Sequence, residues 1–211
     1  MPYLPEHDRV EDRDLLLDVI ARHPLATLVT HDGDEPDADL IPLLARPGPD
    51  GEVDLIGHVA RSNPLWEKPQ SGPVLAVFTA AEHYISPSWY PSKAEHHRVV
   101  PTWNYVVVHA WGELLVHDDP KWVRGVVSRL TQHQESGRDE PWRLGMAPGD
   151  YVDEQLARIV GVSIRVARLS GKFKVSAHRS EADRLGARDG VAGGSAELAR
   201  YMTDPPNAGT V

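Results

Sequence analysis

The segment between residues 82 and 105 carries side chains suited to holding a flat, anionic molecule. It reads EHYISPSWYPSKAEHHRVVPTWNY and contains two of the six tryptophans and three of the six tyrosines of the chain. Aromatic rings can cover a planar ligand, and neighbouring cations and hydroxyls can bind its charged end. The candidate groups are Ser86, Ser88, Trp89, Lys93, Thr102, Trp103 and Asn104. The alternative is a long connection whose rings only pack against a sheet.

A second candidate is the motif GHVARSNP at residues 57–64, which leaves a predicted strand and enters a helix at the proline. The guanidinium of Arg61 can bind an anion with two hydrogen bonds, and free amides at a helix start can add to it. His58, Ser62 and Asn63 are the neighbouring polar groups. The alternative is a surface arginine at a helix entry, with His58 as a packed core histidine.

The third candidate is GKFKVS at residues 171–176. Side chains alternate along a strand, so Lys172, Lys174 and Ser176 share one face. Two cations at this spacing suit a phosphate or carboxylate, whereas lysines on an edge strand also protect it from unwanted pairing. Both interpretations remain open at this point.

The composition excludes several other functions. The chain has 11 histidines but no HExxH pattern and no cysteine, which predicts no metal site of the zinc type. No apolar run has the length of a membrane span and the N-terminus is not a signal peptide, so a cytoplasmic location is expected. The formal net charge of −9 argues against direct binding to nucleic acid, which normally requires a basic face.

The elements that must position these groups alternate with turn signals at short intervals, which favours an antiparallel barrel over βαβ units. Gly171 is expected to form a turn before the last strand, and residues 1–12 to be an arm. Residues 1–180 are expected to form one domain and residues 181–211 a helical or flexible tail that ends in disorder. Strands are predicted at 25–30, 38–44, 53–59, 74–79, 105–116, 162–169 and 173–177, and helices at 12–22, 121–134 and 151–159. Asp119 is expected to cap the second of these helices, with Pro120 at its first position.

Several longer blocks of the chain resemble the PaiB family, proteins described as FMN-binding negative transcriptional regulators and related to pyridoxamine-phosphate oxidases. The blocks are YLPEH, HPLATLVT, GHVARSNPLW, YISPSWYPSK, VPTWNYVVVHAWG, and GKFKVS followed by RSEADR. They occur in the same order over roughly residues 1–190.

The resemblance implies a mainly β fold with peripheral helices, a six-stranded antiparallel split β-barrel, that forms a homodimer with FMN at its interface. It places Arg61 and the polar groups of GHVARSN near the flavin phosphate. The serines, threonine, tryptophans, lysine and asparagine of the 82–105 segment would line the isoalloxazine or ribityl side, and the last strand would add Lys172, Lys174 and Ser176. The implied role is regulatory or flavin-dependent redox chemistry.

Two departures from the family pattern leave a second function open. Family members commonly carry SQNR where this chain has Ser-Ala-His-Arg at 176–179, and a histidine where this chain has Leu40. The same superfamily includes haem-binding piperazate synthases, which close an N–N bond in N5-hydroxyornithine, and a single histidine can hold haem iron without any motif. His58, His109 or His178 would then be the axial ligand. A third possibility, a transcriptional repressor, is disfavoured by the net charge.

Overall fold

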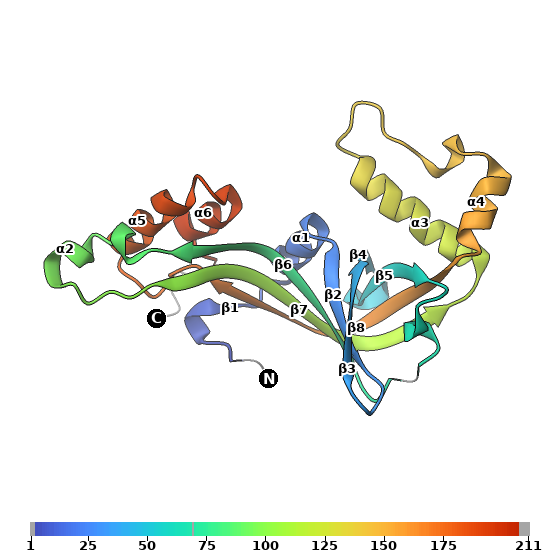
Figure 1. The fold of residues 1–211 in the computed structure, drawn as a ribbon, viewed down its shortest axis with the longest axis horizontal. Helices are drawn as coiled ribbons and strands as arrows, with labels where there is room; N and C mark the ends of the chain where they lie inside the picture. Colours follow the sequence, from blue (N-terminus) through green and yellow to red (C-terminus); the bar gives the residue numbers. More distant parts are fainter. Residues whose placement is uncertain (1–2, 69, 207–211) are drawn as a thin grey trace. The chain divides into compact units, whose positions relative to one another are not determined.

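The computed structural model describes residues 3–68 and 70–206 of the chain. They belong to two compact units (Figure 1). Unit 1 is built from Met1–Arg22, Phe78–His109 and Leu169–Val211, and unit 2 from His23–Val77 and Ala110–Arg168. The three longest strands pass from one unit into the other, so each unit combines segments that are far apart in the sequence.

The strands are β1 (Arg9–Val10), β2 (Leu25–His31), β3 (Pro36–Pro42), β4 (Leu44–Pro47), β5 (Val53–Ala60), β6 (Val74–Ile85), β7 (Thr102–His117) and β8 (Ile159–Lys174). The α-helices are α1 (Arg13–Arg22), α2 (Ser92–His96), α3 (Pro120–Glu135), α4 (Gly149–Leu156), α5 (Glu181–Val191) and α6 (Ala196–Thr203). Short 3-10 helices are η1 (Glu6–Asp8), η2 (Pro49–Gly51), η3 (Pro64–Trp66), η4 (Pro87–Trp89) and η5 (Leu144–Met146).

The strands form one sheet in the order β3-β2-β6-β7-β8-β5-β4, and β1 pairs with β8. Strands β3 and β4 lie at opposite ends of this order, although only Leu43 separates them in the chain. The two edges in unit 2 must therefore approach one another, so the sheet rolls up but does not close by hydrogen bonds among the described residues. This confirms a mainly antiparallel β fold with peripheral helices.

The described part of the chain has eight strands in this sheet, two more than the six of the barrel that the resemblance implies. One predicted strand at 38–44 is divided in two at Pro42, which ends β3 and has no amide hydrogen for a ladder. The expected arm also contributes a strand, since Arg9 and Val10 pair with Lys172 and Gly171.

The predicted turn at Gly171 is also wrong, because β8 continues through this residue to Lys174. A Cβ atom at Gly171 would lie 2.4 Å from Cδ2 of Leu16 in α1. The glycine is therefore explained by the close approach of α1 to the strand.

The core of unit 1 lies between its part of the sheet and the helices α1 and α6. Asp12 begins α1 by accepting a hydrogen bond from the amide of Leu15 at 3.1 Å. The rings of Phe173 in β8 and Tyr201 in α6 meet edge to face with their centroids 5.0 Å apart. Leu16 and Leu198 are fully buried in the same unit, so one face of this part of the sheet is covered.

The core of unit 2 lies beneath α3 and α4. Asp119 caps α3 as the sequence predicts, accepting from the amide of Trp122 at 2.6 Å. One cluster joins α3 to the sheet through Leu44, Ile56, Val126 and Leu130, and a second joins α3 to α4 through Val123, Val152 and Leu156.

No helix in the described residues is both long and apolar enough to cross a membrane. Residues 181–206 of the expected tail contain α5 and α6, whereas the expected disorder of the last five residues concerns positions outside the described residues.

Candidate functional site

Three aromatic rings of unit 1 lie on the face of the sheet opposite its core. Along β7, Asn104 and Val106 are buried, so the alternating residues Trp103 and Tyr105 belong to the other face. The ring of Tyr84 in β6 meets that of Trp103 edge to face at 6.1 Å. The side chains of Trp103 and Tyr84 are 54% and 42% exposed, so this face presents apolar ring surface to solvent.

Two lysines of β8 lie beside these rings. The Nζ atoms of Lys172 and Lys174 are 5.6 and 5.9 Å from the ring centroid of Tyr105, within cation–π distance. Lys174 also donates a 2.6 Å hydrogen bond to the hydroxyl of Thr102, and Lys172 donates to the carbonyl oxygen of Tyr3 at 3.0 Å. We call the surface formed by Tyr84, Trp103, Tyr105, Lys172 and Lys174 the open face.

The N-terminal segment adds titratable groups beside these lysines. Pairing of β1 with β8 brings η1 to this part of unit 1, and the ring of His7 lies 4.8 Å from that of His178. Asp8 is only 3% exposed, and its Oδ1 atom has no hydrogen-bond partner among the described residues. Burial raises the pKa of Asp8, while the charges of His7, Lys172 and other nearby cations partly oppose this.

Burial also lowers the pKa of His178, and the charges of His7 and Arg179 lower it further. The neutral imidazole is therefore favoured at neutral pH.

His7 and Asp8 were not predicted as site residues. His7 ends the YLPEH block and Asp8 follows it, so the family resemblance of this block could have pointed to them. Residues 1–12 have no periodic pattern of apolar residues that would predict where these side chains lie.

Two predicted site residues lie behind the open face, in the core of unit 1. Asn104 is fully buried, and its Nδ2 atom donates a 2.9 Å hydrogen bond to Oγ of Ser176. Ser176 has a φ of 62°, in the left-handed region that non-glycine residues seldom adopt. The bond to Asn104 fixes this bend after β8, so these two residues position Lys174 rather than extend the open face.

The prolines of the YISPSWYPSK block build a compact connection in unit 1. The hydroxyl of Ser86 accepts from the amide of Ser88 at 3.2 Å, and Lys93 donates to the hydroxyl of Ser88 at 3.0 Å. Trp89 packs on α5, where a Cβ atom at Gly190 would lie 2.2 Å from its ring. Ser88, Trp89 and Lys93 line a hollow of about 450 Å³.

The predicted anion-binding arginine lies in unit 2 and is engaged within the chain. Arg61 binds the carboxylate of Asp118 with two hydrogen bonds of 3.1 and 2.5 Å, and its Nε atom donates to the carbonyl oxygen of Ala157 at 2.8 Å. This pairing lowers the pKa of Asp118. The guanidinium would have to exchange Asp118 for a phosphate before it could bind one.

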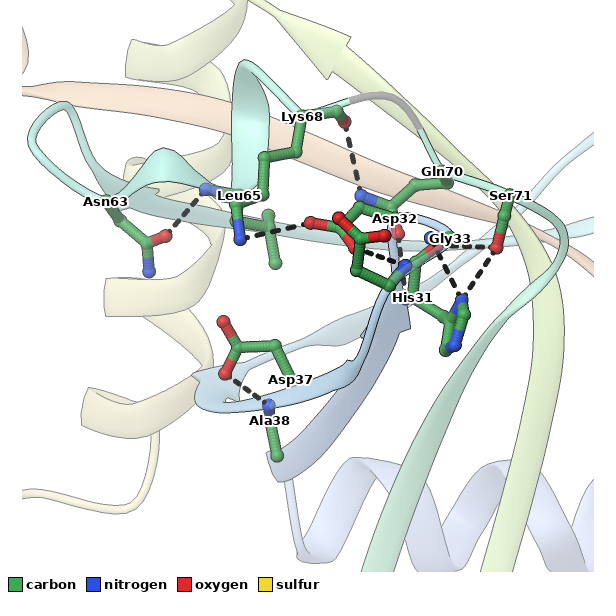
Figure 2. A network of polar contacts seen from close by, with 11 residues as sticks. His31, Asp32, Gly33, Asp37, Ala38, Asn63, Leu65, Lys68, Gln70 and Ser71 are labelled. Carbon is green, nitrogen blue, oxygen red and sulfur yellow. Dashed lines mark hydrogen bonds and ion pairs between the residues drawn. The ribbon is translucent and has the colours of Figure 1, made fainter.

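Asn63 and Ser62 have different surroundings in the same loop. The side chain of Asn63 caps η3 by accepting from the amide of Leu65 at 2.8 Å (Figure 2), and its Nδ2 atom donates to Asp39 at 2.8 Å. Ser62 is exposed. Figure 2 also shows how the segment after η3 is joined to the β2–β3 hairpin: Ser71 is hydrogen-bonded to His31, and Lys68 pairs with Asp32. These contacts hold the loop that contains Ser62 and Asn63 in place.

The three histidines considered as haem ligands are divided between the units. His109 in β7 shares the alternation of Trp103 and Tyr105, and His178 follows β8. His58 in β5 is half-buried, and its Nδ1 atom is buried without a partner among the described residues. Histidines that bind metals usually donate their second ring nitrogen to an acceptor, and His58 has none. The described residues contain no group of three or more metal-binding side chains.

A rolled antiparallel sheet with peripheral helices is the fold of the split-barrel domains, and this is the class of protein that the fold defines. The chain belongs to the family described as "Putative FMN-binding domain", whose model matches residues 2–168. FMN is thus the cofactor supported by the family, as the sequence indicates, and haem remains the alternative. Lys172 and Lys174 lie beyond the matched range.

Relatives in bacteria and fungi agree with this membership. The chain is 27% identical over 184 residues to the Bacillus subtilis "Protease synthase and sporulation protein PAI 2", covering 87% of this chain and 86% of that protein. It is 35% identical over 133 residues to an uncharacterized protein of Aspergillus fumigatus, covering 56% of this chain and 51% of the relative. The chain therefore spans about half the length of that fungal relative.

Solved structures confirm the fold. The FAD- and haem-binding protein of Mycobacterium smegmatis matches with a TM-score of 0.56 at 20% identity, over 79% of this chain and 73% of that one. The flavocytochrome Anf3 of Azotobacter vinelandii matches with a TM-score of 0.57 at 12% identity, over 79% and 69% of the two chains. At these identities the likeness concerns the fold alone.

Proposed function

We propose that this chain binds FMN on the open face of unit 1 and serves in flavin-dependent redox chemistry as a homodimer. The observation that carries the proposal is the position of two lysines beside three aromatic rings on one uncovered face. Lys172 and Lys174 would hold the phosphate, with the Thr102 hydroxyl bonded to Lys174 as a further polar group. Trp103 would cover the ring system, because its exposed face needs an apolar partner.

The donor set fits FMN. A phosphate dianion requires cations and hydrogen-bond donors, and Lys172, Lys174 and Thr102 supply both. Asp8 does not oppose this fit below its raised pKa, where the carboxyl is neutral. A bound flavin would supply the hydride or electron transfer, and the chain would bind and orient it and shield it from water.

This role is better supported than the two other functions. A repressor that binds DNA directly would need a basic face, whereas the chain carries a net charge of −9. A haem enzyme of the piperazate synthase type would need an oriented axial histidine, and His58, one of the three candidates, has no partner on Nδ1 among the described residues. The absorbance of the purified protein separates the cofactors, because flavins absorb near ~450 nm and haems near ~400 nm.

Replacing Lys174 by methionine tests the phosphate contact. We expect Lys174→Met to weaken FMN binding by roughly 1.5–3 kcal/mol, the scale of a lost charge-assisted hydrogen bond. Riboflavin, which lacks the phosphate, should bind both proteins equally. Fluorescence titration of flavin-free protein with each compound measures both affinities.

The matched control is Lys121→Met, which removes an exposed lysine at the start of α3 in unit 2. This variant should bind FMN as the wild type does. Equal FMN affinity of the Lys174→Met variant and the wild type would remove Lys174 from the site, and a colourless protein that binds neither FMN nor haem on titration would reject the proposed function.

A further inference from the structure

A separate pocket lies in unit 2, lined by residues of β5, α3, α4 and the segment that joins the two helices. Its volume is about 300 Å³. Val127, Val152, Leu156 and Ile159 form apolar walls, and none of its described lining residues is Lys, Arg, Asp or Glu. A charged ligand would find no counter-ion on these walls, so the pocket favours an uncharged one.

The lining of this pocket includes two polar groups, the imidazole of His58 and the side-chain amide of Gln155. The Nδ1 atom of His58 is buried and has no hydrogen-bond partner in the described part of the chain, whereas the residue as a whole is only half-buried. Because His58 lines the pocket and its Nδ1 atom is buried, we infer that Nε2 is the nitrogen available to a ligand.

The environment of His58 also sets its hydrogen-bonding role. Burial lowers the pKa of His58 from its ordinary value of 6.5, so the ring is neutral at pH 7. A buried N–H without an acceptor is rarer and costlier than a buried lone pair without a donor. The proton is therefore favoured on Nε2, which makes the ring a hydrogen-bond donor to the pocket.

Two aromatic residues on the pocket walls remain largely exposed. The side chains of Trp142 and Tyr151 are 42% and 54% exposed, and an aromatic ligand would cover part of this apolar surface. The volume is at the lower end of the range for small-molecule sites. It suits a compact ring, and the described lining residues offer no cation for the phosphate of FMN.

We propose that the pocket of unit 2 binds a small, uncharged aromatic molecule with one hydrogen-bond acceptor, which accepts from Nε2 of His58. Aromatic amides and ketones have this chemistry. The site differs from the open face in lining, charge and ligand class, so the proposal does not depend on FMN binding.

Benzamide and benzoate test the proposal, because they have nearly the same shape but differ in charge. We expect benzamide to bind the purified chain of residues 1–211 in saturation-transfer NMR, and benzoate to bind at least tenfold more weakly at pH 7.5. The imidazole signals of His58 in ¹H–¹⁵N correlation spectra should shift on addition of benzamide and show a proton on Nε2.

His58→Phe keeps a ring in the pocket but removes the donor, and should weaken benzamide binding about two- to tenfold, the effect of one neutral hydrogen bond. His96→Phe, at an exposed position of α2 in unit 1, is the matched control and should bind as the wild type. Leu156→Trp fills the pocket and should abolish binding.

Circular dichroism and thermal melting of each variant verify that it is folded. The proposal is overturned if the folded wild type does not bind benzamide, if benzoate binds equally well, or if folded His58→Phe binds benzamide with unchanged affinity. FMN titrations run in parallel report on the open face separately, so a failure there leaves the benzamide result interpretable.

Discussion

At the scale of single residues, Asp8 links the stability of unit 1 to pH. Its carboxyl is buried beside His7 and near two lysines, yet Oδ1 has no hydrogen-bond partner among the described residues. The desolvation of the charged form outweighs the attraction of these cations, so the pKa is raised above its ordinary value of 3.8. The folded protein therefore holds this proton at pH values where the unfolded chain has released it.

The sign of the pH effect follows from this proton. Between the unfolded pKa and the raised folded pKa, the folded state binds more protons, so the free energy of unfolding falls as pH rises through this window. Asp8→Asn cannot release a proton and should remove that fall. We expect the stability difference between the variant and the wild type to increase in favour of the variant as pH rises from the unfolded pKa of 3.8 to the raised folded pKa.

Urea unfolding of both proteins at several pH values measures this difference. Asp12→Asn, an exposed carboxylate at the start of α1, controls for the general effect of removing one negative charge from unit 1. A constant difference between the Asp8→Asn variant and the wild type over the whole range would contradict a raised pKa.

At the scale of elements, close contact between strands β7 and β8 depends on a glycine. A Cβ atom at Gly112 would lie 2.1 Å from the carbonyl oxygen of Arg165, which is backbone and cannot rotate away. In contrast, a Cβ atom at Gly125 in the middle of α3 would meet nothing within 4 Å. The same substitution should therefore have opposite effects in these two elements.

Gly112→Ala should destabilise the protein by about 1–3 kcal/mol, because the strands must separate to admit the methyl group. Gly125→Ala should stabilise it by about 0.5–1 kcal/mol, since alanine is the better helix former. Chemical denaturation of the two variants and the wild type measures their free energies of unfolding. If Gly112→Ala is as stable as the wild type, the strands do not approach so closely.

At the scale of the whole molecule, the open face is a candidate surface for a second copy of the chain. Exposed tryptophan and tyrosine beside cations is the composition typical of interface centres. The proposed homodimer would cover these rings and complete the FMN site with residues of both copies. Trp103 lies on this face, and its side chain is 54% exposed.

Trp103→Glu should weaken self-association at least about 30-fold, the effect expected for the loss of a central tryptophan at an interface. Sedimentation velocity over a range of concentrations measures it. Val116→Glu in unit 2, where the native side chain is 43% exposed, is the control and should associate as the wild type does. A wild-type chain that stays monomeric at high concentration would contradict the dimer.

The sequence by itself determined most of the secondary structure and the family. Alternation, turn residues and caps are local signals, which is why the Asp119 cap and the helix after it were predicted correctly. Long motifs likewise indicated the flavin-binding family, which the family model confirms. The candidate groups Thr102, Trp103, Lys172 and Lys174 were named from residue types and spacing.

Only the tertiary structure decided which of these groups lie together. Strand pairing brought Lys174 to Thr102 and the N-terminal Asp8 to the last strand, whereas Asn104 and Ser176 turned into the core and Arg61 paired with Asp118. The pocket at His58 is likewise formed by segments distant in sequence. Such contacts depend on the path of the whole chain and the competition of charged partners, which no local pattern of residues encodes.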